Sequence, residues 1–178
     1  MSIRSRLERA CAALDAAGVP HAVVGGNAVA VWVGLVDQGA IRNTRDIDIL
    51  LRRTDLDRAI KALVDAGFVP AKTFGVTMFL DGPDAKPSES IHLLFAGERV
   101  QDNYLLPSPD VNDAERPTTF SVLALEPLVR MKLTSFRLKD RVHIQDLISV
   151  GLISRDWLSR FPPELAERLS ELLDNPNA

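Results

Sequence analysis

Residues 21–27 read HAVVGGN, and residues 46–51 read DIDILL. The apolar run from His21 to Val24 is typical of a short strand, and the two glycines after it allow a tight turn into a helix. The second stretch carries another apolar run, from Ile47 to Leu51, which predicts a further strand. Strand, glycine turn, helix and strand in this order predict a sheet with a helix packed against it.

Helical and extended patterns alternate over the rest of the first two-thirds of the chain. Apolar residues at helical spacing predict a helix over residues 2–17 and another that begins with Thr54 as its cap. Residues 27–35 are apolar all round, as in a short helix packed on a sheet. The other segments expected here are strands at 45–51, 68–69, 73–80 and 90–95, a loop at 81–88 and an irregular connection at 100–117.

The last third of the chain is helical in pattern. Residues 125–138 predict one helix, which residues 139–150 continue or restart, and two more helices are expected at 154–161 and after Pro162. We therefore expect an α+β fold. A mixed sheet flanked by helices would occupy residues 1–122, and a C-terminal helical extension over residues 123–178 would pack on it as one compact unit.

Composition sets limits on the class of protein. The chain has 178 residues, 46% of them hydrophobic, which suits one ordinary globular core, and its formal net charge of −3 gives no long-range reason to bind a nucleic-acid backbone. The single cysteine, Cys11, excludes an internal disulfide framework and is interpreted as a core residue rather than a reactive thiol. With no targeting pattern and no membrane-length apolar run, these features predict a soluble, cytoplasmic protein.

The glycine turn is a candidate anion site. Gly25 and Gly26 allow close approach to the backbone, and a helix beginning there would offer unpaired N–H groups to a phosphate. Asn27 would cap this helix and could also contact a phosphate oxygen. The alternative is that the three residues form an ordinary connection between a strand and a helix.

The paired aspartates are a candidate metal site. Residues two apart in a strand point to the same side, so Asp46 and Asp48 would share one face, and two such carboxylates suit Mg²⁺ with a bound triphosphate. A solvated strand face is the alternative. Asp55 and Asp57 repeat the pattern at a helix start, where positions two apart diverge, and are interpreted as compensation of the helix dipole.

Together these motifs resemble the nucleotidyltransferase superfamily, with the DNA polymerase β-like fold. The resemblance is closest to its small bacterial branch, which includes abortive-infection (AbiEii-like) toxins and minimal nucleotidyltransferases. It covers roughly residues 20–150 and rests on four stretches: residues 23–27 (VVGGN), 44–49 (TRDIDI), 90–95 (SIHLLF) and 130–133 (RMKL).

The resemblance implies a reaction and roles for residues. A hydroxyl group would attack the α-phosphate of a nucleoside triphosphate, pyrophosphate would leave, and Mg²⁺ would stabilise the charge. The implied magnesium ligands are Asp46 and Asp48, and the implied nucleotide-binding residues are Gly25, Gly26, Asn27, Lys132 and Arg137. Thr44 and Arg45 could reach the phosphates from the preceding loop, although Arg45 would serve equally as a surface residue.

The acceptor stays open at this point. A protein, an RNA end such as that of a tRNA, and a small hydroxylated molecule are all compatible, as is a place in a toxin–antitoxin pair with a cognate antitoxin. Two other classes compete with this hypothesis. One is a catalytically impaired member that binds nucleotide or a protein partner without transfer, and the other is an unrelated α+β binding domain.

His92 departs from the family pattern, because the superfamily normally has another acidic residue at this position of its third strand. Three interpretations remain open. His92 could be the base that accepts the hydroxyl proton. The site could instead have lost a metal charge and with it catalysis, or His92 could be a strand histidine without a role.

The segment from Lys132 to Asp146 alternates basic and acidic residues. For Lys139, Arg141 and Asp146 a solvated, salt-bridged helix face is expected. Asp140 and His143, three positions apart, could pair with one another. Lys132 differs, because its apolar neighbours require it to leave an apolar stripe to meet solvent or a phosphate.

Overall fold

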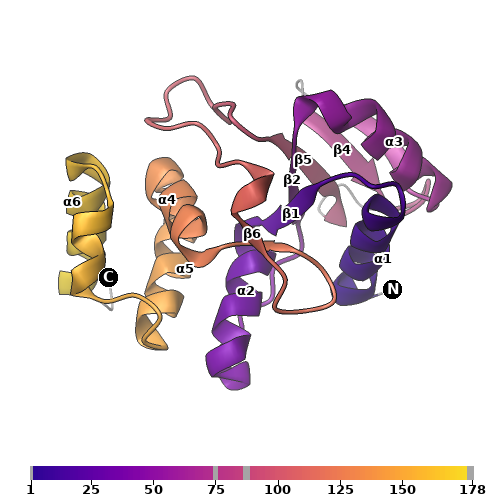
Figure 1. Cartoon of the computed structure of the whole chain (residues 1–178). Coiled ribbons are helices and arrows are strands. Elements are labelled where there is room, and N and C mark those ends of the chain that lie inside the picture. The colour runs from indigo at the N-terminus through magenta and orange to yellow at the C-terminus, as the bar shows by residue number, and fades with distance from the viewer. Residues whose placement is uncertain (1, 74–75, 86–88, 176–178) are drawn as a thin grey trace.

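The computed structural model describes residues 2–73, 76–85 and 89–175 of the chain (Figure 1). Its strands are β1 (His21–Val24), β2 (Ile47–Leu51), β3 (Val69–Thr73), β4 (Val76–Leu80), β5 (Ile91–Phe95), β6 (Ala114–Glu115) and β7 (Val122–Leu123). Within the described residues they form one sheet in the order β3-β4-β5-β2-β1-β7-β6. The β2–β5 and β1–β7 pairs are parallel and the other pairs antiparallel. The predicted mixed sheet and α+β class are therefore confirmed.

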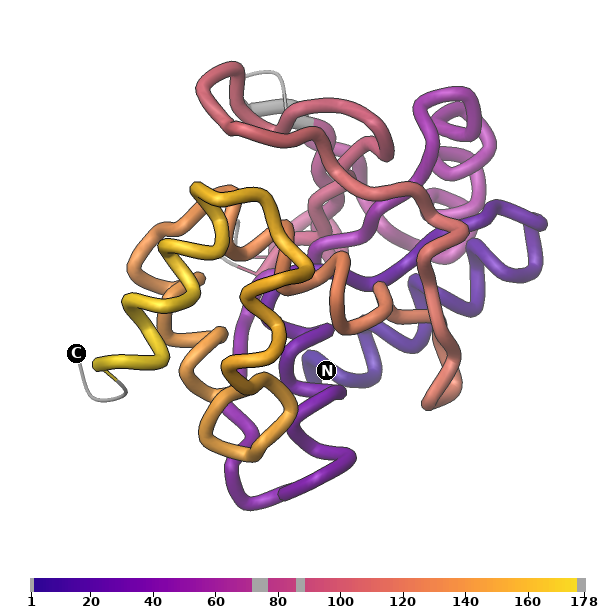
Figure 2. The backbone as a smooth tube through the Cα atoms, turned by 60° about the vertical axis from the view of Figure 1, so that its left-hand side comes forward, coloured from indigo at the N-terminus to yellow at the C-terminus, as the bar shows by residue number. Residues whose placement is uncertain are grey.

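The helices are α1 (Ile3–Ala16), α2 (Gly25–Val36), α3 (Leu56–Asp65), α4 (Leu125–Ser135), α5 (Leu138–Ser149) and α6 (Pro163–Asp174). Helices α1 and α3 pack against each other on one side of the molecule (Figure 1). Helices α4, α5 and α6 pack together on the other side, and α2 lies between this group and strands β1 and β2. Figure 2 shows α6 at the far edge of this helical group. No helix in the described part of the chain is long and apolar enough to cross a membrane.

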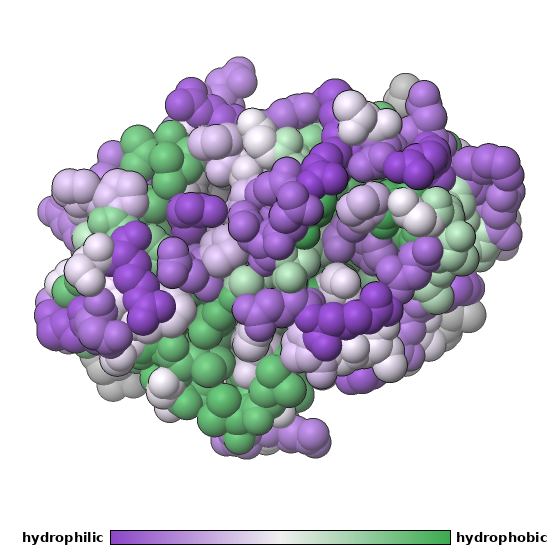
Figure 3. Space-filling model, viewed as in Figure 1, coloured by the Kyte–Doolittle hydropathy of each residue, from purple (hydrophilic) through white to green (hydrophobic). Residues whose placement is uncertain are grey.

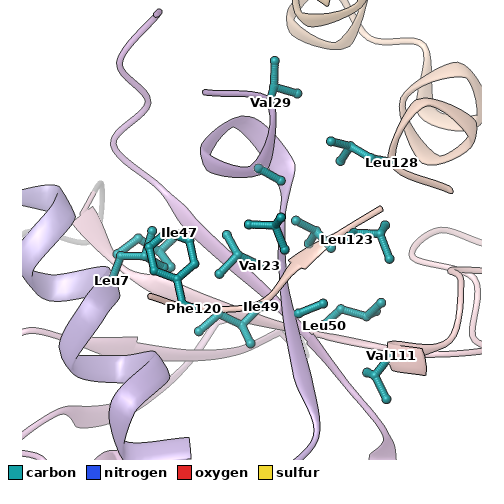
Figure 4. Packing of buried hydrophobic residues seen from close by; sticks show 14 of the residues in the cluster. Leu7, Val23, Val29, Ile47, Ile49, Leu50, Val111, Phe120, Leu123 and Leu128 are labelled. Atoms are coloured by element: carbon teal, nitrogen blue, oxygen red, sulfur yellow. The ribbon is translucent and has the colours of Figure 1, made fainter. Parts of the chain in front are cut away.

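The core is one hydrophobic cluster that takes side chains from both helical groups and from the central strands. Leu7 of α1, Val23 of β1, Ile49 of β2 and Leu128 of α4 all belong to it and are buried (Figure 4). Cys11 is part of this cluster, as predicted, and burial raises the pKa of its thiol to about 12, which makes it a poor nucleophile.

An exposed apolar patch lies at the end of α2. The side chains of Leu35 and Val36 are more than half exposed there. Figure 3 shows hydrophobic surface at this lower end of the molecule, where α2 ends in the view of Figure 1.

Several predicted boundaries were wrong. Helix α2 begins at Gly25 with Val24 before it, so Asn27 is its third residue and not its cap. Thr54 belongs to a short 3-10 turn (Arg53–Asp55), and α3 begins only at Leu56. The helix expected over residues 125–138 ends at Ser135, because Phe136 has a left-handed backbone (φ 46°) that breaks it from α5.

Other expectations differ in smaller ways. Residues 100–117, expected to be irregular, include a 3-10 turn (Val111–Asp113) and β6, and residues 155–160 are 3-10 rather than α-helical. Residues 74–75 of the strand expected at 73–80, and residues 86–88 of the expected loop, lie outside the described residues. The division of the chain at residues 122 and 123 stays a prediction.

Candidate active site

A cleft of about 890 Å³ opens beside the N-terminal ends of β2 and β5. Its walls come from the start of α2, the loop before β2, the segment after β5 and the junction of α4 and α5. Among the residues that line it are most of those singled out from the sequence, namely Gly25, Gly26, Thr44, Arg45, Asp46, Asp48, His92, Lys132 and Arg137. Asn27 does not line the cleft.

Strand register places Asp48 at the centre of this site. In the sheet Asp48 pairs with Val24 of β1 on one side and with His92 of β5 on the other. Paired residues in neighbouring strands project side chains to the same face, so Asp48 and His92 lie next to each other and beside the turn that follows β1. The register therefore joins the two motifs on which the sequence prediction depends.

Gly25 lies directly over the carboxylate of Asp48. Its backbone is left-handed (φ 68°), and a Cβ atom built on it would be 2.2 Å from Oδ2 of Asp48. Only glycine can occupy this position without displacing the carboxylate. The neighbouring Gly26 is also confined, although less tightly, because a Cβ atom there would be 2.9 Å from Cγ2 of Thr44 and 3.1 Å from Cε1 of His143.

Asp48 is held by His92. The ring nitrogen Nδ1 of His92 lies 3.3 Å from Oδ1 of Asp48, and Nε2 lies 2.8 Å from Oγ of Ser90. Burial alone would raise the pKa of Asp48, but the hydrogen bond from His92 and the nearby charge of Lys132 outweigh it, so this pKa lies below its usual value. The same hydrogen bond raises the pKa of His92 against the opposing effect of burial.

Asp46 stands just before β2, at the cleft. Its side chain lines the cleft and makes no hydrogen bond or ion pair with any described residue. Its backbone carbonyl is fixed, because the side-chain amide of Asn27 donates a hydrogen bond to it at 2.7 Å. Asn27 therefore anchors the segment that carries Asp46, a contact different from the phosphate contact expected from the sequence.

The donor set fits a hard divalent cation that keeps water or phosphate ligands. Asp46 and Asp48 supply carboxylate oxygens at the cleft, which are the ligands that Mg²⁺ prefers. Over residues 2–73, 76–85 and 89–175, no group of three or more His, Cys, Asp or Glu side chains is arranged to hold a metal ion. The protein would thus contribute two carboxylates and leave the other coordination positions to water or a ligand.

Lys132 and Arg137 meet on one buried carboxylate. Nζ of Lys132 is 2.9 Å from Oδ1 of Asp140, and Nε of Arg137 is 2.7 Å from Oδ2. Asp140 has no exposed surface and Lys132 is only 5% exposed. Burial opposes the charge on Asp140, but the two cations hold its pKa well below the usual range. Burial lowers the pKa of Lys132 despite Asp140 beside it.

The expected pair between Asp140 and His143 was wrong. Nδ1 of His143 is buried and has no hydrogen-bond partner in the described structure. Burial, and then the charge of Lys132, lower the pKa of His143 to about 4, so its ring is neutral near pH 7. His143 lies against Gly26 at the wall of the cleft.

The expected salt-bridged face of α5 is only partly present. Arg141 pairs with Glu171 and Asp146 pairs with Arg42. Lys139 instead lines the cleft, is exposed, and makes no ion pair or hydrogen bond with the described part of the chain. Arg45 also lines the cleft, is likewise exposed, and has no ion pair or hydrogen bond from its side chain to the described residues. Lys139 and Arg45 are thus cations at the cleft that form no ion pair with a carboxylate of the described residues.

Sequence reasoning missed the roles of Ser90 and Asp140. Asp140 follows Arg137 by three residues, a spacing at which side chains of one helix can meet. It follows Lys132 by eight residues, and contact over that spacing requires the helix to break between the two. Ser90 precedes His92 by two residues, which places both side chains on one side of an extended segment. That spacing is the signal that could have identified Ser90.

Comparisons with known proteins agree with this architecture. The model of a family described as uncharacterised nucleotidyltransferases matches residues 1–103. Among solved structures, the chain is similar to an antigenic nucleotidyltransferase-like protein from Paracoccidioides brasiliensis, with a TM-score of 0.62 and 18% identity over 97% of this chain and 88% of that one. A comparison with curated proteins gave no match.

Two further structures share the fold. The antibiotic-resistance factor ANT(2'')-Ia aligns with a TM-score of 0.57 and 13% identity over 98% of this chain and 94% of that one. JHP933 from Helicobacter pylori aligns with a TM-score of 0.52 and 16% identity, covering 98% of this chain and 74% of that one. At these identities the structural matches establish the fold alone.

Proposed function

Because the chain belongs to the family of uncharacterised nucleotidyltransferases whose model matches its first 103 residues, we propose that it transfers a nucleoside monophosphate from a nucleoside triphosphate to a hydroxyl group. The superfamily expected from the sequence is confirmed by this match. The abortive-infection branch stays a prediction, since the matches do not bear on it.

The observation that carries the proposal is the contact between the glycine turn and Asp48 at one cleft. Gly25 leaves no space for a side chain over the Asp48 carboxylate, and Asp46 offers a free carboxylate beside it. Asp46 and Asp48 would hold Mg²⁺, which supplies charge stabilisation for the reacting phosphate and the leaving pyrophosphate. This proximity of backbone and carboxylates is what a metal–triphosphate complex requires.

The triphosphate would lie between the start of α2 and the basic wall of the cleft. Backbone N–H groups at Gly25 and Gly26 begin a twelve-residue helix and favour an anion there. Arg45 and Lys139 can pair with phosphate directly because neither has a carboxylate partner in the described chain. Lys132 and Arg137 remain proposed phosphate contacts, but their charge is shared with Asp140.

The hydroxyl of the acceptor would attack the α-phosphorus, form the new P–O bond, and release pyrophosphate as the bond between the α- and β-phosphates breaks. A protein, an RNA end such as that of a tRNA, and a small hydroxylated molecule remain the acceptor classes. We also propose a role in a toxin–antitoxin pair with a cognate antitoxin. Co-purification with a second protein that inhibits the transfer reaction would support this role.

Two labelled nucleotides test the proposal. Label on the α-phosphate should appear on an acceptor when the purified protein, Mg²⁺ and cell extract are combined, whereas label on the γ-phosphate should appear only in pyrophosphate. Asp46→Asn combined with Asp48→Asn should abolish the transfer. Transfer of the γ-label would mean phosphoryl rather than nucleotidyl transfer, and transfer by the double variant would contradict the metal assignment.

A second candidate function is nucleotide binding without transfer. It is favoured by His92, which stands where the superfamily normally has a third acidic residue and pairs with Asp48. Such a protein would bind a nucleoside triphosphate with Mg²⁺ in the same cleft. Binding without any α-label transfer, across protein, RNA and small-molecule acceptors, would support this candidate over the first.

A further inference from the structure

Ser90, His92 and Asp48 form a continuous hydrogen-bond chain near the N-terminal ends of the adjacent strands β5 and β2. His92 uses both ring nitrogens, Nδ1 toward Asp48 at 3.3 Å and Nε2 toward Ser90 at 2.8 Å. The backbone of Ser90 is itself tied to β2, because the N–H of Ile47 donates to its carbonyl at 3.1 Å. All three side chains are thus placed by the pairing of two neighbouring strands.

The chemistry of the partners fixes which nitrogen carries the proton. An ionised carboxylate only accepts hydrogen bonds, so Nδ1 of His92 must donate to Asp48. In the neutral ring Nε2 is then the acceptor, and the Ser90 hydroxyl donates to it. No lone pair on the ring is left for the hydroxyl of an acceptor substrate unless the Ser90 contact breaks.

Ser90 is not a nucleophile in this arrangement, although serine, histidine and aspartate are the residue types of a hydrolytic triad. Its side chain has no exposed surface and it does not line the cleft. A substrate can therefore reach Asp48 and His92 but not Ser90. The chain of hydrogen bonds ends at the carboxylate of Asp48, which lines the cleft together with His92.

The carboxylate of Asp48 is consequently held at one oxygen and leaves the other for a cation. His92 holds Oδ1, and Oδ2 lies under Gly25. The side chain of Asp46, by contrast, makes no hydrogen bond or ion pair with the described residues.

We propose that Ser90 and His92 are positioning residues that hold Asp48 in the orientation needed to bind the divalent cation, and that His92 is not the general base. Hydrogen bonds from outer groups that orient metal-binding side chains are a general feature of metal sites. This inference takes the identity of the cation from the proposed function. It adds a role for Ser90 and selects a role for His92 that differs from all three sequence interpretations.

The test separates orientation from proton transfer with four variants. His92→Ala removes the donor to Asp48, whereas His92→Asn keeps an N–H group close to the position of Nδ1 but has no basic nitrogen. Ser90→Ala removes the hydroxyl that holds the ring, and Ser90→Thr retains it as the matched control. Mn²⁺, measured by calorimetry on the full chain, serves as the probe for the cation site.

We expect Mn²⁺ affinity to fall about 10- to 100-fold in His92→Ala, the range typical of lost outer hydrogen bonds. Ser90→Ala should lose affinity in the same direction, while Ser90→Thr should remain close to the unchanged protein and His92→Asn should bind Mn²⁺ more tightly than His92→Ala. If the unchanged protein transfers the α-label, transfer by His92→Asn should fall only in proportion to its Mn²⁺ affinity. Unchanged Mn²⁺ affinity in His92→Ala, or loss of transfer with intact Mn²⁺ affinity in His92→Asn, would overturn the proposal.

A second readout needs neither metal nor activity. Nitrogen NMR of the metal-free protein should show His92 held with its proton on Nδ1, and Asp48→Ala, which removes the acceptor of that proton, should release it to a mixture of tautomers. A freely exchanging ring in the unchanged protein would overturn the inference even if nucleotide transfer is found. Conversely, a fixed ring in a protein that binds no Mn²⁺ would count against the proposed function and leave the hydrogen-bond chain in place.

Discussion

A methyl group on Gly25 would lie 2.2 Å from Oδ2 of Asp48, inside any permissible contact distance. This relationship joins two motifs that are more than twenty residues apart. It also means that the carboxylate of Asp48 can lie this close to the backbone turn only because residue 25 has no side chain. The predictions below follow from this contact and from the charged groups around it.

Gly25→Ala should damage the site beyond its effect on stability. The left-handed backbone alone costs an alanine about 1–2 kcal/mol, and the clash with Asp48 adds to this and displaces the carboxylate. Gly18→Ala is a matched control, because Gly18 has a similar φ of 62° with nothing within 4 Å of its added Cβ. Both variants should unfold at lower denaturant concentration, but only Gly25→Ala should lose nucleotide-dependent stabilisation. Equal nucleotide effects in the two would refute this reasoning.

Asp140→Asn should destabilise the protein strongly, since Lys132 would remain buried without its counter-ion. Removing one partner of a buried pair costs about 3–5 kcal/mol, and we expect about 3 because asparagine keeps one acceptor oxygen. Asp65→Asn is the control: Asp65 pairs with Lys61 at the surface, where both side chains are more than 60% exposed, and should cost at most about 1 kcal/mol. Chemical denaturation of both variants measures the difference, and a similar small loss in each would be inconsistent with this role for Asp140.

His143 should make the protein sensitive to mild acid. Its pKa is about 4 in the folded chain and near 6.5 when unfolded, so between these values the unfolded chain binds a proton that the folded chain does not. Its contribution to stability is therefore complete above pH 6.5 and declines as the pH falls toward 4. The charged groups that affect this pKa are Lys132, Asp140, Asp146 and Lys139.

The measurement is the free energy of unfolding of the unchanged protein and of His143→Gln at several pH values. Each such proton changes this free energy by about 1.4 kcal/mol per pH unit, so the variant should show a shallower decline between pH 6.5 and 4. Some decline should persist, because burial also lowers the pKa of His21. Parallel curves for the two proteins would show that His143 is not a source of the acid sensitivity.

Local sequence was sufficient for the elements that build the site. The apolar run before Gly25 and the apolar residues after Asp46 predict β1 and β2 because both signals lie within a few residues. The break after Ser135 was not predictable in the same way, since the left-handed Phe136 carries no glycine or proline signal. That break is what allows Asp140 to reach Lys132.

Contacts between distant residues could not be read from pattern. His92 was identified at the right strand, but its contact with Asp48 depends on the parallel register of β2 and β5, which are more than forty residues apart. Periodicity specifies which face a residue lies on, not which strand lies beside it. The partner of Asn27 and the surroundings of His143 and Lys139 depend in the same way on packing between elements.

Metal-dependent nucleotide binding tests the central claim most directly. Thermal unfolding should be measured with a nucleoside triphosphate, with and without Mg²⁺, for the unchanged protein, for Asp46→Asn with Asp48→Asn, and for the helix-start control Asp57→Asn. When the free concentration of the nucleoside triphosphate is a hundred times its dissociation constant, binding should raise the free energy of unfolding by about 2.7 kcal/mol. We predict this stabilisation with Mg²⁺ in the unchanged protein and in Asp57→Asn, and its loss in the double variant or after chelation. Equal stabilisation of the double variant, or none in the unchanged protein, would contradict the metal–triphosphate site.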